Sequence, residues 1–291
     1  MKMPRRLLGT GFLALVFLFF YAPIASVIVY SFNESPVASE WTRFSTQWYA
    51  KVFGDKEVLD AAWISFELAI ATAFASMVLG AWIGFVLATW RRFAGHTLFS
   101  AMINAPMVLP EVISGISLLL MFVGLEQVLG WPRGRGLVTM WIGHVMLCIS
   151  YVAITVQARL SAIDKPLSEA ARDLGATQLR VFFDITMPII APSLVSGWLL
   201  SFTISIDDVI MSAFLSGPET TTLPLVLLSR MRIGLDPEIN ALGTLFILVV
   251  GVAVLVNNYM LMKREHRRTR DLQMAMHAEP PAGAGRPAPD I

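Results

Sequence analysis

Long apolar segments alternate with short polar ones along most of the chain. Six of the apolar segments are long enough to cross a bilayer, since a transmembrane helix needs about 20 apolar residues. Their approximate limits are 7–31, 61–90, 98–125, 137–158, 189–215 and 241–262. The pattern therefore predicts an all-α, polytopic membrane protein with six transmembrane helices.

Two of the predicted spans have features of their own. The first, 7–31, is longer than the apolar core of a signal peptide and lacks a small-residue cleavage site, so we expect it to be retained. The third is interrupted by Pro106, Pro110 and Gly115. Because proline inside a helix removes a hydrogen bond and favours a bend, we expect a broken helix there, of the kind that lines cavities.

The polar segments divide the chain into an N-terminus, 1–6, a transmembrane domain, 7–262, with a loop at 159–188, and a tail, 263–291. The tail is first basic and then rich in proline, alanine and glycine, so we expect its end to be disordered. Six spans place both termini on one side, and this side carries about twice as many lysines and arginines as the other. The positive-inside bias therefore predicts that both termini and the 159–188 loop are cytoplasmic.

Composition excludes several kinds of chemistry. Hydrophobic residues make up 56% of the chain and charged residues 15%, and the net charge is +1. The single cysteine, Cys148, rules out an intrachain disulfide. The histidines lack metal-ligand spacing, so we expect no metal, and we expect His144 to be a hydrogen-bonded interior residue. Without a G-x-x-x-x-G-K-[ST] phosphate loop or a paired nucleophile and base, the chain is not expected to be an enzyme or to hold a cofactor.

The 159–188 loop contains a short amphipathic pattern. Four apolar residues recur at the i, i+3, i+4 and i+7 positions of one helical face: Leu167, Ala170, Ala171 and Leu174. We expect Gly175 to end this helix in the left-handed conformation and Thr177 to cap the next helix. An amphipathic helix of this length also suits the membrane surface, which leaves that interpretation open.

A longer pattern runs through the same loop. It consists of Glu169-Ala170-Ala171, three residues, Gly175, nine residues, Ile185, one residue, Met187 and Pro188. It resembles the signature cytoplasmic loop of binding-protein-dependent ABC importer permeases, E-A-A-x3-G-x9-I-x-L-P, with methionine in place of leucine as its departure. The resemblance implies the ABC type I importer permease fold and a coupling helix that docks on a cytoplasmic ATPase. It makes six residues candidates for ATPase coupling: Glu169, Ala170, Ala171, Gly175, Ile185 and Pro188.

Acidic residues inside the apolar spans are candidates for a transport path. They are Glu67, Glu111, Asp207 and Asp208. A charge at the centre of a bilayer costs at least about 2.5 to 3.5 kcal/mol, and such residues commonly mark an ion or substrate path. Trp198 could add a cation–π contact, although packing would explain it as well. Ion pairs with a partner subunit, or contact with water at the outer interface, would also explain the acids.

Further stretches resemble the second permease of putrescine/spermidine importers, and the resemblance covers nearly all of residues 7–270. The stretches that carry it are at 30–33, 48–49, 105–111, 205–208, 214–218, 222–224 and 234–241. The resemblance implies a multi-pass protein of the bacterial inner membrane and a polyamine cargo. It also implies a homologous permease, two copies of an ATPase and a periplasmic polyamine-binding protein as partners, and no nucleic acid. The alternatives are a permease of this fold for ferric iron or an opine, and a proton-coupled secondary transporter.

Overall fold

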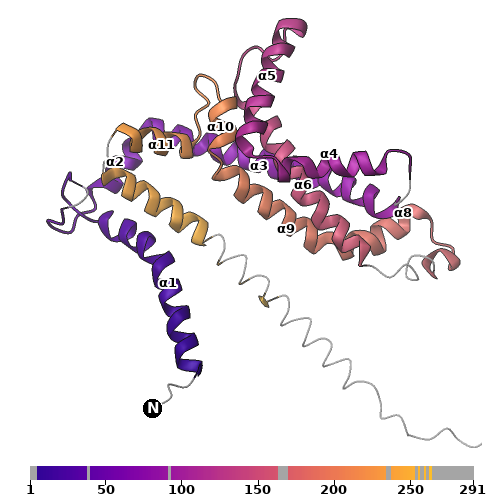
Figure 1. Cartoon of the computed structure of the whole chain (residues 1–291), viewed down its shortest axis with the longest axis horizontal. Helices are drawn as coiled ribbons and strands as arrows, with labels where there is room; N and C mark the ends of the chain where they lie inside the picture. Colours follow the sequence, from indigo (N-terminus) through magenta and orange to yellow (C-terminus); the bar gives the residue numbers. More distant parts are fainter. Residues whose placement is uncertain are drawn as a thin grey trace, which may run out of the picture. The chain divides into compact units, whose positions relative to one another are not determined.

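The computed structural model describes residues 5–37, 40–90, 93–162, 170–233, 237–252, 255, 259, 262 and 263. Within them the chain is helical apart from its loops and one isolated β-bridge. Figure 1 labels the helices in chain order. They are α1 (Arg5–Tyr30), α2 (Gln47–Gly54), α3 (Lys56–Thr89), α4 (His96–Val108), α5 (Glu111–Leu129), α6 (Leu137–Ser161), α8 (Gln178–Val181), the π-helix η1 (Phe182–Thr186), α9 (Met187–Ile206), α10 (Ile210–Leu215) and α11 (Leu223–Ile233), and a further helix covers Pro237–Val252.

Five described helical segments are long and apolar enough to cross a membrane. They are Gly9–Tyr30, Lys56–Thr89, Glu111–Leu129, Leu137–Ser161 and Gln178–Ile206. Each overlaps one of the first five predicted spans. The sixth predicted span, 241–262, overlaps the shorter apolar helix Pro237–Val252, and most of its remainder lies outside the described residues. The predicted all-helical, polytopic architecture is therefore confirmed, with five to six apolar helices.

The described residues form two compact units. One contains those within Met1–Ala50 and Asp236–Ile291, and the other contains those within Lys51–Leu235. The first unit is organised around Asn33, whose side chain donates to the Glu40 carbonyl over 2.6 Å and accepts from the Ser35 and Thr42 amides. The Trp48 indole donates to the Asn33 carbonyl over 2.7 Å. Because the buried amide has these partners, the loop after α1 is folded upon itself.

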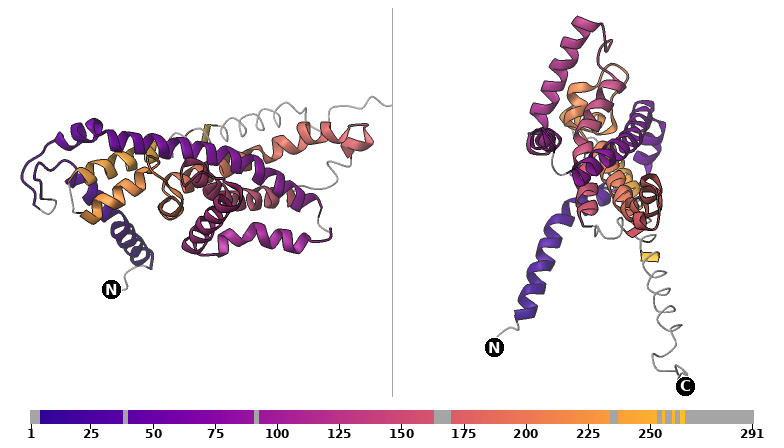
Figure 2. Two further views of the ribbon diagram at one scale, coloured as in Figure 1. Left: turned by 90° about the horizontal axis from the view of Figure 1, so that it is seen from above. Right: turned by 90° about the vertical axis from the view of Figure 1, so that its right-hand side faces the viewer.

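The second unit is built on the contacts of α3, α6 and α9 (Figure 2). Glycines on α3 allow the helices to approach closely: a Cβ on Gly80 would lie 2.6 Å from the Val152 Cβ, and one on Gly84 would lie 2.6 Å from the Ala153 carbonyl oxygen. Gly197 of α9 packs on the same valine. Because lipid tails are as apolar as the side chains, membrane helices associate through such close packing rather than through a hydrophobic drive.

The third predicted span is two helices rather than one bent helix. Helix α4 ends at Val108, the next residue, Leu109, has an extended ψ of 136°, and α5 begins after Pro110. The residue before a proline disfavours the helical conformation because the proline ring meets its backbone, and Pro110 itself has no N–H to continue the ladder. Figure 1 shows α5 leaving α4 at a steep angle. The predicted break is confirmed, and it lies at Leu109–Pro110.

The fifth predicted span, 189–215, is also divided, which its apolar pattern does not predict. Helix α9 ends at Ile206 and α10 begins at Ile210. The Asp208 carboxylate accepts hydrogen bonds from the Met211 amide (3.3 Å) and the Ser212 amide (2.8 Å). An aspartate that takes backbone N–H groups in this way starts a new helix, so the prediction of one continuous span is wrong.

An arginine joins α11 to the start of α3. Arg230 Nη2 lies 2.6 Å from Asp55 Oδ2 and 2.8 Å from Glu57 Oε2. Asp55 also caps α3 by accepting from the Glu57 and Val58 amides. Burial raises the pKa of Asp55, but the hydrogen bonds from Arg230 and the two amides, together with the Arg230 charge, outweigh burial and lower it.

Acid should loosen this junction. A carboxylate with a lowered pKa stabilises the fold fully above its unfolded pKa of about 3.9, and the stabilisation is lost as the pH falls through the folded value. Hydrogen exchange of α11 amides, corrected for intrinsic rates, should speed up by up to about fivefold below about pH 4, as expected for an ion pair worth about 1 kcal/mol. Arg230→Met should remove this extra pH dependence, and its persistence in the variant would contradict the assignment.

Candidate functional site

Three of the predicted path acids lie around one cavity of about 380 Å³. Glu111, at the first turn of α5, lines it together with Asp207 and Asp208, which lie in the break between α9 and α10. The remaining lining residues are Tyr151, Ile204, Val209 and Ile210. The cavity therefore brings together carboxylates from two helix interruptions, and interrupted backbone at membrane depth is tolerated where it lines a cavity.

The three acids are not equivalent. Glu111 and Asp207 are exposed, whereas the Asp208 side chain is only 5% exposed. Asp208 accepts the two amides at the start of α10 and lies 3.3 Å from His144 Nε2. Asp208 therefore has hydrogen-bond partners within the chain, and the two exposed carboxylates that line the cavity are Glu111 and Asp207.

His144 of α6 lies behind this cavity and is buried at 2% exposure. Its Nδ1 lies 2.8 Å from Ser205 Oγ, and its Nε2 lies 3.3 Å from both Asp208 Oδ2 and Ser212 Oγ. The prediction of a hydrogen-bonded interior histidine is confirmed. Within the described part of the chain, no group of three or more His, Cys, Asp and Glu residues could hold a metal ion.

Sequence reasoning did not single out Tyr151 as a cavity residue or His144 as a partner of Asp208. One signal was present: the two residues are seven apart on α6, so they share a helical face. Their alignment with residues near position 208 depends on how α6 packs against α9, and no local pattern contains that information.

Two other path candidates lie outside this cavity. Glu67 is exposed on α3 in a separate groove of about 180 Å³, together with Leu68, Ala71, Leu137, Val138 and Trp141. Trp198 stacks on Phe202 at a ring distance of 5.5 Å and meets Phe74 edge to face. These contacts explain Trp198 through packing, and a cation–π contact for it remains a prediction.

The signature loop ends its first helix as predicted. Gly175 has a φ of +85°, and the Ala176 amide donates to the Ala171 carbonyl over 3.0 Å, which is a Schellman closure. The Thr177 hydroxyl then accepts from the Arg180 amide and caps α8. Both local predictions are therefore confirmed.

The end of the signature forms a π-helix. In η1 the Met187 amide donates to the Phe182 carbonyl, five residues back. Pro188 follows directly; it has no N–H for the Asp184 carbonyl, and its ring would collide with that carbonyl in a regular α-helix. The wider turn avoids this collision, and such π-turns are frequent at functional sites.

The signature loop presents apolar side chains on its surface. Leu174 is 90% exposed, Leu179 is 71% exposed and Phe183 is 60% exposed. Among the coupling candidates, Ala170 and Pro188 are exposed and Ala171 and Ile185 are half-buried. Glu169 lies outside the described residues, as does Leu167 of the predicted apolar face.

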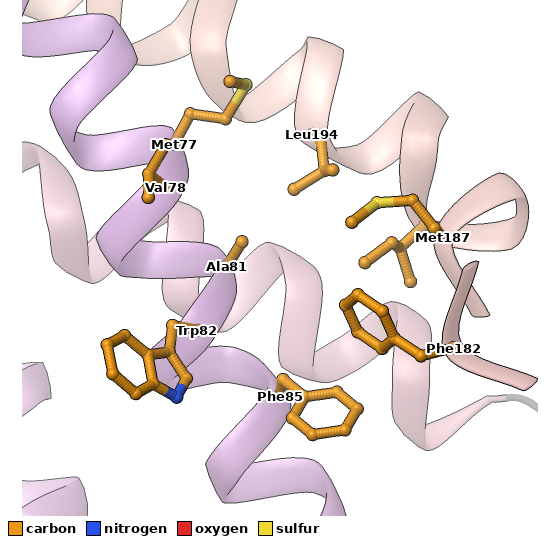
Figure 3. Close-up of a pocket in the computed structure, with 9 residues that line it drawn as sticks. Met77, Val78, Ala81, Trp82, Phe85, Phe182, Met187 and Leu194 are labelled. Carbon is orange, nitrogen blue, oxygen red and sulfur yellow. The ribbon is translucent and has the colours of Figure 1, made fainter. Parts of the chain in front are cut away.

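An apolar pocket of about 420 Å³ lies between the end of the signature and helix α3 (Figure 3). Phe182 and Met187 form its wall on the loop side, and Met77, Ala81 and Phe85 of α3 face them. The Phe85 and Phe182 rings meet edge to face at 5.5 Å. The signature is therefore packed against α3, and a displacement of the loop must move these rings.

Comparison with known proteins gives a consistent answer. Residues 76–267 match the family described as "Binding-protein-dependent transport system inner membrane component". The "Putrescine transport system permease protein PotI" of Escherichia coli (strain K12) is 45% identical over 263 residues, which is 90% of this chain and 94% of that protein. The "Spermidine/putrescine transport system permease protein PotC" of the same strain is 34% identical, and the match covers 92% of this chain and 99% of that protein.

A solved structure shares the architecture. A chain of a bacterial ABC transporter involved in the import of the acidic polysaccharide alginate superposes with a TM-score of 0.65 at 15% identity, and the match covers 88% of this chain and 95% of that one. At this identity the likeness concerns the fold alone. It confirms the ABC importer permease fold that the signature loop predicts.

Proposed function

We propose that this chain is the permease of an ATP-driven polyamine importer, and the premise is its family: the chain belongs to the inner membrane components of binding-protein-dependent transport systems. It is a multi-pass inner membrane protein and a transport subunit rather than an enzyme. What it transports follows from the names of its relatives only by analogy. The observation that carries the proposal is the cavity that Glu111 and Asp207 share.

The chemistry of that cavity suits a cationic cargo. Two exposed carboxylates face a space at the ends of interrupted membrane helices, and Tyr151 adds an aromatic hydroxyl. A polyamine that crosses a region of low dielectric needs compensation for its ammonium charges, and carboxylates supply it as charge-assisted hydrogen bonds. The relatives whose names include putrescine and spermidine support this class of cargo.

Helix α9 provides a mechanical link for ATP-driven movement. It begins at the signature's Met187 and ends at Ile206, directly before the path carboxylate Asp207. Its 20 residues make a rod about 30 Å long. We expect closure of an ATPase dimer to displace the signature loop, and α9 then carries this displacement to Asp207 and changes its distance from Glu111 on α5.

Exposed surfaces of the chain indicate where its partner subunits would bind. The exposed Leu174 and Ala170 of the signature loop suit a groove on a cytoplasmic ATPase, of which we expect two copies in the complex. Helix α5 exposes much of its apolar surface, which suits a homologous permease that completes the path. A periplasmic binding protein would deliver the cargo.

Uptake of radiolabelled putrescine tests this function. The complete transporter is expressed in a strain deleted for polyamine uptake, and unlabelled putrescine, spermidine, ferric iron and an opine compete. We expect competition by the two polyamines only, and uptake that stops when the ATPase is inactivated. Competition by iron or an opine would show that this solute is the cargo instead. Uptake that persists without the ATPase would favour a proton-coupled transporter.

The orientation proposed for the chain is testable separately. We expect both termini and the signature loop in the cytoplasm, because basic residues concentrate on that side. A reporter fused after Lys165 should therefore be cytoplasmic, and fusions near Lys51 or Gly217 should be periplasmic. Periplasmic alkaline phosphatase activity from the Lys165 fusion would contradict this topology.

A further inference from the structure

A buried polar network bridges the break between α9 and α10. His144 belongs to the continuous helix α6, whereas Ser205 is in the last turn of α9 and Ser212 is in α10. The imidazole contacts both serine hydroxyls and the Asp208 carboxylate between them. His144 therefore connects both sides of the break to one uninterrupted helix.

The imidazole and the carboxylate are close enough to interact directly. His144 Nε2 lies 3.3 Å from Asp208 Oδ2, and a carboxylate can only accept a hydrogen bond. The two amides of α10 complete the partners of that carboxylate. Asp208 is thus held towards the interior by two amide donors and the contact with His144, and its side chain is 5% exposed.

The position of Asp207 depends on this anchor. It is the neighbour of Asp208 in the chain, it ends α9 in a non-helical conformation with φ −100° and ψ 1°, and it is exposed to the cavity. If Asp208 turned outward, the backbone of the break would rotate and Asp207 would move with it. The contact with His144 and the two amide hydrogen bonds thus accompany an inward Asp208 side chain, whereas Asp207 is exposed.

We propose that His144 is a positioning residue of the transport path: it keeps the Asp208 carboxylate buried in the cavity wall and thereby directs Asp207 into the cavity beside Glu111. Asp208 then does not touch the cargo. This inference rests on the proposed function, since the cavity is taken to be the cation path. It predicts that replacing His144 lowers transport because Asp207 is displaced, and not because the packing of the helices changes.

Two substitutions separate the contacts of the imidazole. His144→Asn keeps a polar group near Ser205 but is too short to reach Asp208, whereas His144→Gln places an amide nitrogen near the position of Nε2. In the complete transporter, we expect His144→Asn to lower putrescine uptake about tenfold per assembled complex, as for the loss of a hydrogen bond to a charged group. We expect His144→Gln to lower it by less than about threefold, because the donor to Asp208 is retained.

A double-mutant cycle with Asp207→Asn supplies the deciding measurement. If the histidine acts through Asp207, His144→Asn should add no further loss of uptake once Asp207 is neutral. Cys148→Ala is the matched control, because Cys148 is also buried on α6 and contacts the Ser201 carbonyl of α9 without touching the network. Its effect should be the same with or without Asp207→Asn.

Additive losses in the His144 cycle, or equal losses from the two His144 variants, would overturn the proposal. If His144→Asn fails to assemble, Asp208→Asn removes the same charged contact and should show the same non-additivity with Asp207→Asn. The same double-mutant cycle is also measured by ATP hydrolysis that the loaded binding protein stimulates. This measurement does not require the cargo to be a polyamine. If unlabelled polyamines do not compete with uptake by the wild-type transporter, this result contradicts the proposed function alone.

Discussion

We expect Gly175→Val to abolish uptake while the transporter still assembles. Gly175 has a φ of +85°, and among the described residues no heavy atom lies within 4 Å of the position of an added Cβ. Valine therefore meets open space, and its cost is the backbone conformation, about 1 to 3 kcal/mol for a β-branched residue in the left-handed region. The strain falls at the residue that sets the angle between the two helices of the signature loop.

The measurement compares uptake, assembled yield and ATP hydrolysis stimulated by the loaded binding protein. Gly130→Val is the matched control, because Gly130 ends α5 with a φ of +68° and an added Cβ there would likewise have no heavy atom of the described residues within 4 Å. It carries similar strain without touching the signature. Gly175→Asn should restore part of the uptake, since asparagine tolerates the left-handed region.

Uptake and ATP hydrolysis should fall together in Gly175→Val and remain near wild type in Gly130→Val. Equal losses in the two valine variants would show that strain alone, and not the signature, is responsible. Wild-type uptake from a Glu169→Lys, Gly175→Val double variant would remove the coupling assignment altogether.

The features that sequence predicted well are those that adjacent residues determine. Gly175 and Thr177 end and start helices through hydrogen bonds that reach no more than five residues along the chain. The break at Leu109–Pro110 follows from the chemistry of proline and the residue before it. Neither feature depends on how the helices pack, so a pattern of residue types contains the necessary information.

The break after Ile206 was missed because the span is apolar on both sides of it. Asp208 could either cap a new helix or remain in a continuous one, and its contact with His144, 64 residues earlier, helps to decide between them. The placement of Glu111 and Asp207 around one cavity likewise depends on packing between helices distant in sequence. The same limit applies to Glu67, whose residue type matches the other acids but whose groove is separate.

Neutralising the two exposed carboxylates should impair transport without harming the complex. Glu111→Gln and Asp207→Asn keep the size and the hydrogen-bonding capacity of each side chain and remove its charge. Each lost charge-assisted hydrogen bond is worth about 1.5 to 3 kcal/mol, so uptake should fall by about 10- to 100-fold per variant. The loss should be greater for spermidine than for putrescine, because the longer polyamine carries one more charge to compensate.

The control is Glu126→Gln, which removes the same charge from the far end of α5, where Glu126 Oε1 accepts from the Gly134 amide outside the cavity. A glutamine can accept this hydrogen bond, so uptake should stay near wild type.

Assembled yield is measured beside uptake of both polyamines for each variant. Loss of assembly in Glu111→Gln and Asp207→Asn would make the two acids structural ion-pair partners of another subunit. Intact assembly with unchanged uptake would exclude them from the path, because a cation that passes two carboxylates in a medium of low dielectric cannot be indifferent to their charge.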